Sequence, residues 1–261
     1  NNYGQLGDGT ASTRTTPTQV LTGVISIAAG GYHSLALTTD GNLLAWGRND
    51  YGQVGDATTT VRYIPTQVLT GVSAMAAGYF HSLALTSDGN LWAWGANSFG
   101  QLGDDTTLTR TAPTSIMAGV AALAAGGYHS LALLTDASLS AWGRNNFGQL
   151  GDGTTTDVHT PIPILTGVAA MAAGIEHSLA LTTDGNLLAW GNNGAGQLGD
   201  GTTTTRTTPT QVLTDVLTLA AGYYHSLALT SDGRLWAWGA NSYGQLGDGT
   251  TTSRVCPTQT I

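Results

Sequence analysis

The sequence repeats with a fixed step of 48 residues, and an internal repeat of this length restricts the possible folds more than any other feature. The dipeptide Trp-Gly begins at residues 46, 94, 142, 190 and 238, and histidines stand at residues 33, 81, 129, 177 and 225. The segment Gly-Gln-Leu-Gly, or Gly-Gln-Val-Gly in one copy, begins at residues 4, 52, 100, 148, 196 and 244. We therefore expect each copy to form one unit that packs on its neighbours.

Within one unit, residues 24–71, short apolar runs alternate with clusters of Gly, Asp and Thr. This punctuation predicts four strands. We name them A, B, C and D, and we expect them at residues 24–29, 33–38, 43–46 and near 66–69. The Thr-Asp-Gly-Asn link between strands B and C is typical of a tight hairpin, because glycine adopts a positive φ without steric cost.

The two ends of the unit indicate the order of the strands. Strand A ends in Ala-Ala-Gly in all five units, and small residues suit a crowded position near a ring axis. Strand D carries a proline in each unit, which is tolerated chiefly at sheet edges. These prolines are Pro65, Pro113, Pro161 or Pro163, Pro209 and Pro257. The pattern predicts an all-β fold, a β-propeller or propeller arc of four-stranded antiparallel blades. The 37 glycines disfavour the alternative of helical repeats.

The chain is expected to form a single repeat domain over residues 1–261. The expected units are residues 24–71, 72–119, 120–167, 168–215 and 216–261. An extra outer strand is expected within residues 1–23, near Thr18 to Leu21. Either five blades close into a ring with this strand left over, or the chain is an arc of a larger ring. Because the sequence starts within a repeat, we expect it to be a processed or excised piece of a longer polypeptide.

The unit also resembles a known family, through AAGGYHSLALTTDGNLLAWG at residues 28–47 and NDYGQVG at residues 49–55. These segments are similar to the repeats of the regulator of chromosome condensation family, and also to those of the propeller-type β-lactamase inhibitory protein. The resemblance implies a propeller, for which seven blades are usual. This chain departs from that number, with five complete sets of strands A to D.

Charge and composition exclude several classes of function. The net charge of −8 and the absence of lysine disfavour nucleic acid as a partner, because affinity for phosphates comes largely from Lys and Arg. No apolar run is long enough to predict a membrane-spanning helix. Cys256 is the only cysteine, so no intrachain disulfide is possible. Abundant threonine and near-identical units without lysine lead us to expect an extracellular or cell-surface location in a bacterium.

Variation between the copies points to one face of the propeller. In an up-and-down blade the A–B and C–D loops emerge on one face, while the B–C and D–A loops emerge on the other. The B–C and D–A loops are nearly invariant, whereas the A–B and C–D loops vary and carry aromatic and charged residues. Such residue types dominate protein-binding hot spots. The candidate binding residues are Tyr32, Arg48, Tyr51, Tyr79, Phe80, Phe99, Tyr128, Arg144, Phe147, Glu176, Tyr223, Tyr224 and Tyr243. The alternative is that these side chains pack on neighbouring loops and stabilise the ring.

The repeated histidines and aspartates raise the question of a metal or catalytic site. Each histidine starts a strand B, and we expect a structural role in which a ring nitrogen bonds a neighbouring backbone group. Asp8, Asp152, Asp200 and Asp248 follow the Gly-Gln-Leu-Gly segments and are expected to form turns rather than bind calcium. We expect no metal and no cofactor.

No catalytic constellation is evident, and near-identical copies do not form the asymmetric site that most chemistry needs. The sequence therefore predicts a non-enzymatic scaffold that binds a protein through the A–B/C–D loop face. The alternative is a structural segment of a secreted or cell-surface repeat protein, or a self-assembling fibre. The expected partner is accordingly another protein or further copies of the same chain.

Overall fold

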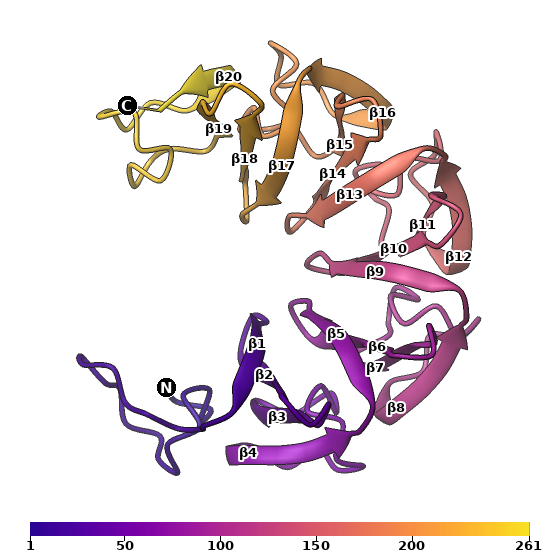
Figure 1. Cartoon of the computed structure of the whole chain (residues 1–261), viewed down its shortest axis with the longest axis vertical. Coiled ribbons are helices and arrows are strands. Elements are labelled where there is room, and N and C mark those ends of the chain that lie inside the picture. The colour runs from indigo at the N-terminus through magenta and orange to yellow at the C-terminus, as the bar shows by residue number, and fades with distance from the viewer. Residues whose placement is uncertain (261) are drawn as a thin grey trace.

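The computed structural model describes residues 1–260, which form strands and loops without a helix. Twenty strands make five four-stranded antiparallel sheets, each in the order A–B–C–D. Figure 1 shows the sheets following one another around an open arc, with strand A of each sheet on the inner side. The predicted propeller arc is therefore confirmed. No helix in this part of the chain is long and apolar enough to cross a membrane.

The strands recur at the same positions in every blade. Strand A is β1 (Val24–Ala29), β5 (Val72–Ala77), β9 (Val120–Ala125), β13 (Val168–Ala173) and β17 (Val216–Ala221). Strand B is β2 (His33–Thr38), β6 (His81–Thr86), β10 (His129–Leu134), β14 (His177–Thr182) and β18 (His225–Thr230). Strand C is β3 (Leu43–Gly47), β7 (Leu91–Gly95), β11 (Leu139–Gly143), β15 (Leu187–Gly191) and β19 (Leu235–Gly239). Strand D is β4 (Arg62–Leu69), β8 (Arg110–Met117), β12 (Val158–Leu165), β16 (Arg206–Leu213) and β20 (Arg254–Gln259).

The inner and outer edges of the blades follow the residue types expected for them. The Ala-Gly ends of all five A strands line a cavity of about 280 Å³ on the axis of the arc. Strand D forms the outer edge and pairs only with strand C, so Pro65 in β4 removes no hydrogen bond needed by a further strand. Strand D is longer than expected, because it starts at Arg62 rather than near residue 66.

The hydrophobic core lies between adjacent blades and repeats along the arc. Leu131, Leu139 and Ala141 of the third blade pack on Val168 and Trp190 of the fourth, and all five are buried. The indole Nε1 of Trp190 donates to the carbonyl oxygen of Gln149 in the preceding blade, at 2.9 Å. The same bond recurs at the other four Trp-Gly tryptophans. Trp94, Trp142, Trp190 and Trp238 therefore bond across a blade interface, and Trp46 bonds residues 1–10 in the same way.

The extra outer strand expected near Thr18 to Leu21 does not form, since no residue before Val24 is in a strand. A strand D needs a strand C beside it, and residues 1–17 contain no strand. Residues 1–10 instead pack on the first blade in the way that the C–D loop of each blade packs on the next blade. The carbonyl oxygen of Gln5 accepts hydrogen bonds from Trp46 Nε1, at 2.9 Å, and from Ser34 Oγ, at 2.8 Å.

The first and last blades do not meet, and Figure 1 shows them apart at the two ends of the arc. Leu139 in an inner blade is fully buried, whereas Leu235 at the same position of the last blade is 43% exposed. The five blades therefore form an open arc and do not close into a ring.

Candidate functional site

The A–B and C–D loops are joined directly by a backbone hydrogen bond. The amide N–H of Arg48, the first C–D residue, donates to the carbonyl oxygen of Tyr32 in the A–B loop, at 2.9 Å. The equivalent bond forms in all five blades, with Arg144 and Tyr128 at 3.0 Å as another example. The bond fixes the two variable loops of each blade against each other, so their side chains lie on one shared face.

On this face, the aromatic residue of one C–D loop packs on the A–B loop of the next blade. The rings of Tyr51 and Phe80 are 5.1 Å apart, and those of Phe99 and Tyr128 are 5.6 Å apart. Edge-on and tilted pairs at these distances contribute roughly 1 kcal/mol each beyond their buried area. The alternative expected from the sequence, packing between loops, therefore accounts for part of the aromatic set.

Tyr79 lies at the centre of the aromatic cluster. Its ring contacts those of Tyr32, Phe80 and Tyr128, with centroids 4.7–5.8 Å away, and its hydroxyl donates to the Tyr32 hydroxyl at 3.2 Å. That hydrogen bond raises the pKa of Tyr32. Tyr79 also approaches Tyr223 of the last blade, at 6.2 Å between centroids. Both rings line the cavity on the axis, so the cluster surrounds the cavity mouth.

Two arginines are stacked within the cluster. The Arg48 guanidinium lies 4.9–5.5 Å from the ring centroids of Tyr3, Tyr32 and Phe80, and it bonds Asp50 at 2.6 Å. The hydrogen bond to Asp50 raises the Arg48 pKa. Arg144 lies over Phe99 and Tyr128 in the same way, and it pairs with Glu176 at 3.7 Å. Each cation thus has its own carboxylate, and the stacking fixes the plane of each guanidinium.

Three of the predicted residues stay outside this packing. Phe147 has no aromatic partner in the next blade, because the matching A–B residue is Glu176. Tyr224 lacks a C–D partner ring because the matching residue of the preceding blade is Ala195. Tyr243 is 93% exposed, since it belongs to the last blade of the arc.

The exposed part of the face differs from the packed part. Tyr32, Phe80 and Tyr128 are half-buried, whereas Tyr223 is 53% exposed and Tyr51 is 40% exposed. The half-buried rings stabilise the loops, and the exposed rings are open to a partner.

Two residues of the face are absent from the set expected from the sequence. Tyr3 packs on Tyr32 at 5.6 Å and also lies under Arg48. It stands one repeat step before Tyr51, so the period itself could have found it. Ile175 lines the axial cavity beside Tyr79 and Tyr223. Its position was visible as an A–B residue, but only the structure places it at the axis.

The histidines form bonds between blades, but with a different partner from the expected one. His129 Nε2 lies 2.9 Å from Ser178 Oγ of the next blade, and the ring is fully buried. The expected backbone partner is therefore wrong, because the serine of the following B strand occupies that place. Burial lowers the pKa of His129 to about 3. A ring that is neutral, buried and bonded in this way is a structural element.

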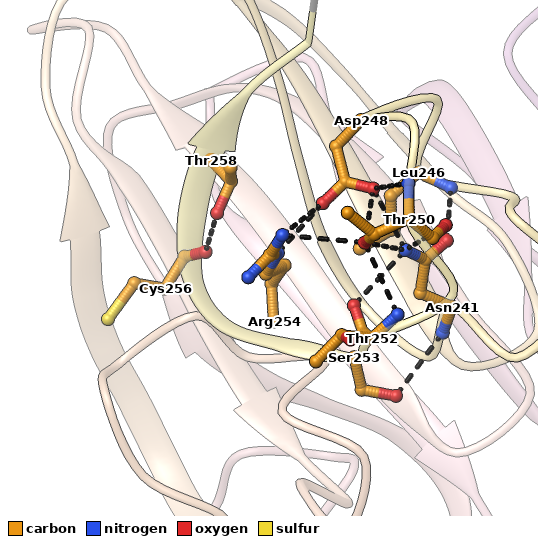
Figure 2. A network of polar contacts seen from close by, with 9 residues as sticks. All are labelled: Asn241, Leu246, Asp248, Thr250, Thr252, Ser253, Arg254, Cys256 and Thr258. Atoms are coloured by element: carbon orange, nitrogen blue, oxygen red, sulfur yellow. Dashed lines mark hydrogen bonds and ion pairs between the residues drawn. The ribbon is translucent and has the colours of Figure 1, made fainter.

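The C–D loops are held by a repeated network of side chains, shown for the last blade in Figure 2. Asp248 accepts hydrogen bonds from the Thr250 amide at 3.0 Å and from Arg254 Nε at 2.8 Å. The amide nitrogen of Asn241 donates to Asp248 and to the carbonyl oxygens of Thr250 and Thr252. The pKa of Asp248 lies below its usual range, and the hydrogen bond from the Thr250 hydroxyl is the largest cause. These carboxylates close turns, and residues 1–260 contain no cluster of three metal-ligating side chains.

Models of known protein families match the repeats of this chain. Two models, each described as a regulator of chromosome condensation (RCC1) repeat, match it. One covers residues 1–37, 40–85, 88–133, 137–181, 184–229 and 232–260, which is nearly the whole chain. The other matches residues 24–53, 72–101, 120–149, 168–197 and 216–245.

Solved structures show the same arrangement of blades. Human WBSCR16 is 28% identical and superposes with a TM-score of 0.82 over 91% of this chain and 67% of its own. Saccharomyces cerevisiae Prp20p, described with its binding properties to Gsp1p and histones, is 29% identical, with a TM-score of 0.79 over 90% of this chain and 65% of its own. Among curated proteins, human HERC4, a probable E3 ubiquitin-protein ligase, is 46% identical over 54 residues, which are 19% of this chain and 5% of that protein. The chain thus spans about two-thirds of the solved relatives and a small part of the ligase.

Proposed function

The chain belongs to the regulator of chromosome condensation repeat family, and from this premise we propose that it is a protein-binding scaffold that uses its A–B/C–D loop face. The observation that carries the proposal is the set of exposed rings on this face, chiefly Tyr223, Tyr224 and Tyr51, of which Tyr223 lines the axial cavity. Exposed tyrosines on a fixed support lose little conformational entropy on binding, and they are enriched in binding hot spots.

The packed part of the cluster supports this role by fixing the loops. Tyr79 connects rings from the first three blades with Tyr223 of the last, so the face is preorganised before a partner arrives. Preorganisation lowers the entropic cost of binding. The binding of Gsp1p and histones described for Prp20p shows that a related propeller binds proteins, and it supports the same class of activity here.

The remaining parts of the proposal concern catalysis and location. We propose a non-enzymatic role, because the repeated side chains of the face form stacked pairs and turns rather than a nucleophile beside a base. An extracellular or cell-surface location in a bacterium stays a prediction. Its support is compositional, namely the absence of lysine and the abundance of threonine.

Replacing Tyr223 and Tyr224 together by serine is expected to weaken partner binding at least tenfold while the chain remains folded, since both rings are more than one-third exposed. The matched control is the pair Thr183→Ala and Asp184→Asn, on the opposite B–C face, which should bind like the unchanged chain. The measurement is affinity capture from cells of the source organism, followed by titration of the identified protein by calorimetry. Equal binding by all three proteins, with lower stability of the tyrosine variant, would show that the rings serve packing alone.

A further inference from the structure

Four histidines form a series of identical contacts between adjacent blades, and neither the binding face nor the turns account for it. In each contact the Nε2 atom lies 2.9–3.0 Å from a serine Oγ in the next blade. The pairs are His33 with Ser82, His81 with Ser130, His129 with Ser178, and His177 with Ser226. All four rings are buried, with exposed fractions of 0–1%.

The hydrogen bonds of the serines determine which ring nitrogen carries the hydrogen. Ser178 Oγ donates to the carbonyl oxygen of Gln149 at 2.7 Å, so it accepts from His129 Nε2. The hydrogen of the neutral ring is therefore on Nε2, and Nδ1 is an acceptor. Within residues 1–260, the buried Nδ1 atoms of these four histidines have no hydrogen-bond partner.

The surroundings leave the protonated ring no means of stabilisation. A Cβ added to Gly126 would lie 2.4 Å from His129 Nδ1, so the ring rests directly on the glycine backbone. The titratable groups that act on the ring of His129 are His81 and His177. Likewise His33 acts on His81, and His225 acts on His177. Thus the titratable groups that act on each ring are further histidines, which repel it once both are protonated.

We propose that this His–Ser series makes the contacts between blades acid-sensitive, so that proton uptake separates adjacent blades and exposes their leucine-lined faces. Each histidine stays neutral while its ring is enclosed. Because the ring is buried against glycine backbone and bonded to the serine of the next blade, a blade contact must open before Nδ1 meets water and takes up a proton. The four contacts share this property, so the arc responds to acid along its whole length. The inference does not depend on the proposed binding role.

The pKa values place this response in a defined pH window. Burial lowers the pKa of His33 to about 4 and that of His81, His129 and His177 to about 3, whereas an unfolded histidine has a pKa of about 6.5. As the pH falls below about 6.5, the unfolded state binds protons first, and stability is lost down to the folded pKa values. For each pH unit below that point, one histidine raises the equilibrium constant of unfolding by up to about tenfold, and the four together raise it by up to about ten-thousand-fold.

Carboxylates act outside most of this window. Their ordinary pKa in the unfolded chain is about 3.9, and the hydrogen bond from Arg14 lowers the pKa of Asp8 to about 2. Stability from such a group is fully present well above the unfolded pKa and is lost progressively below about pH 5. A transition between about pH 6 and 5 therefore reports the histidines.

The test measures the unfolding equilibrium in urea, by tryptophan fluorescence, at several pH values between 7.5 and 5 for the whole chain and two variants. His129→Gln keeps an N–H donor toward Ser178 but does not titrate, and Thr183→Ala, in an exposed B–C loop outside the series, is the control. For the unchanged chain, the slope of log K against pH should approach four protons below pH 6 from the four enclosed rings, with a smaller addition from His225, whose pKa is also lowered by burial. The slope should be about one proton smaller for His129→Gln and equal to that of the unchanged chain for Thr183→Ala. Equal slopes for the unchanged chain and His129→Gln, or no pH dependence above pH 5, would overturn the inference.

A second measurement needs no variant. Within residues 1–260, no blade follows that of His225 and no serine bonds its ring, which is only half-buried. In an NMR titration of the folded chain, we expect the His225 ring to titrate while the four enclosed rings keep neutral shifts until the protein unfolds. Titration of all five rings near pH 6 in the folded chain would show that the four rings are accessible to protons and would overturn the inference.

Discussion

Replacing Gly126 with alanine is expected to lower the free energy of unfolding by about 3 kcal/mol. The added Cβ would lie 2.2 Å from His129 Cε1 and 2.7 Å from the carbonyl oxygen of Gly174 in the next blade. Neither neighbour can yield easily, because one is backbone and the other is held by its bond to Ser178 at 2.9 Å. Equilibrium unfolding in urea, followed by tryptophan fluorescence, measures the loss.

The matched control is Gly194→Ala. Gly194 lies in an exposed C–D loop, and a Cβ there would meet only Asn192 Oδ1, at 3.4 Å. This change should alter stability by no more than about 0.5 kcal/mol. Equal stability of the two variants would show that the contact between strand A and the histidine is looser than described.

The second large effect is expected for Trp142→Ala, which should cost about 4 kcal/mol. Trp142 is fully buried between the second and third blades, where it packs with Leu83 and Leu91. Its Nε1 donates to the carbonyl oxygen of Gln101 at 3.0 Å. The substitution removes this bond and leaves a cavity between two rigid sheets, which cannot collapse to fill it.

Trp46→Ala is the comparison, because Trp46 occupies the same repeat position in the first blade. It bonds Gln5 in residues 1–10 rather than a complete preceding blade, and it is 8% exposed. We expect a loss of about 2 kcal/mol, since a loop without a sheet behind it relaxes around the missing ring more readily. Denaturant unfolding of both variants gives the difference. A cost for Trp46→Ala equal to or above that of Trp142→Ala would contradict the assignment of the core to the blade interfaces.

The candidate face was predicted in outline, and its internal arrangement was not. Alternation of constant and variable loops placed Tyr79, Phe80 and Arg144 on one face. The central position of Tyr79 could not be predicted from the sequence, since it depends on the distance across the axis to Tyr223 in the last blade. The same holds for Phe147, whose lack of a partner ring depends on Glu176 in the next blade.

The sequence by itself determined the blade. The period, the small residues of strand A and the prolines of strand D act within one unit or between equivalent positions, so they can be read locally. The tertiary structure alone decided contacts that join one blade to the next. Residues 18–21 carry a strand D sequence but form no strand, because pairing requires a strand C beside them. The histidine partner is likewise Ser178 of the following blade rather than a nearby backbone group, because the curvature of the arc sets which residues of two rigid sheets meet.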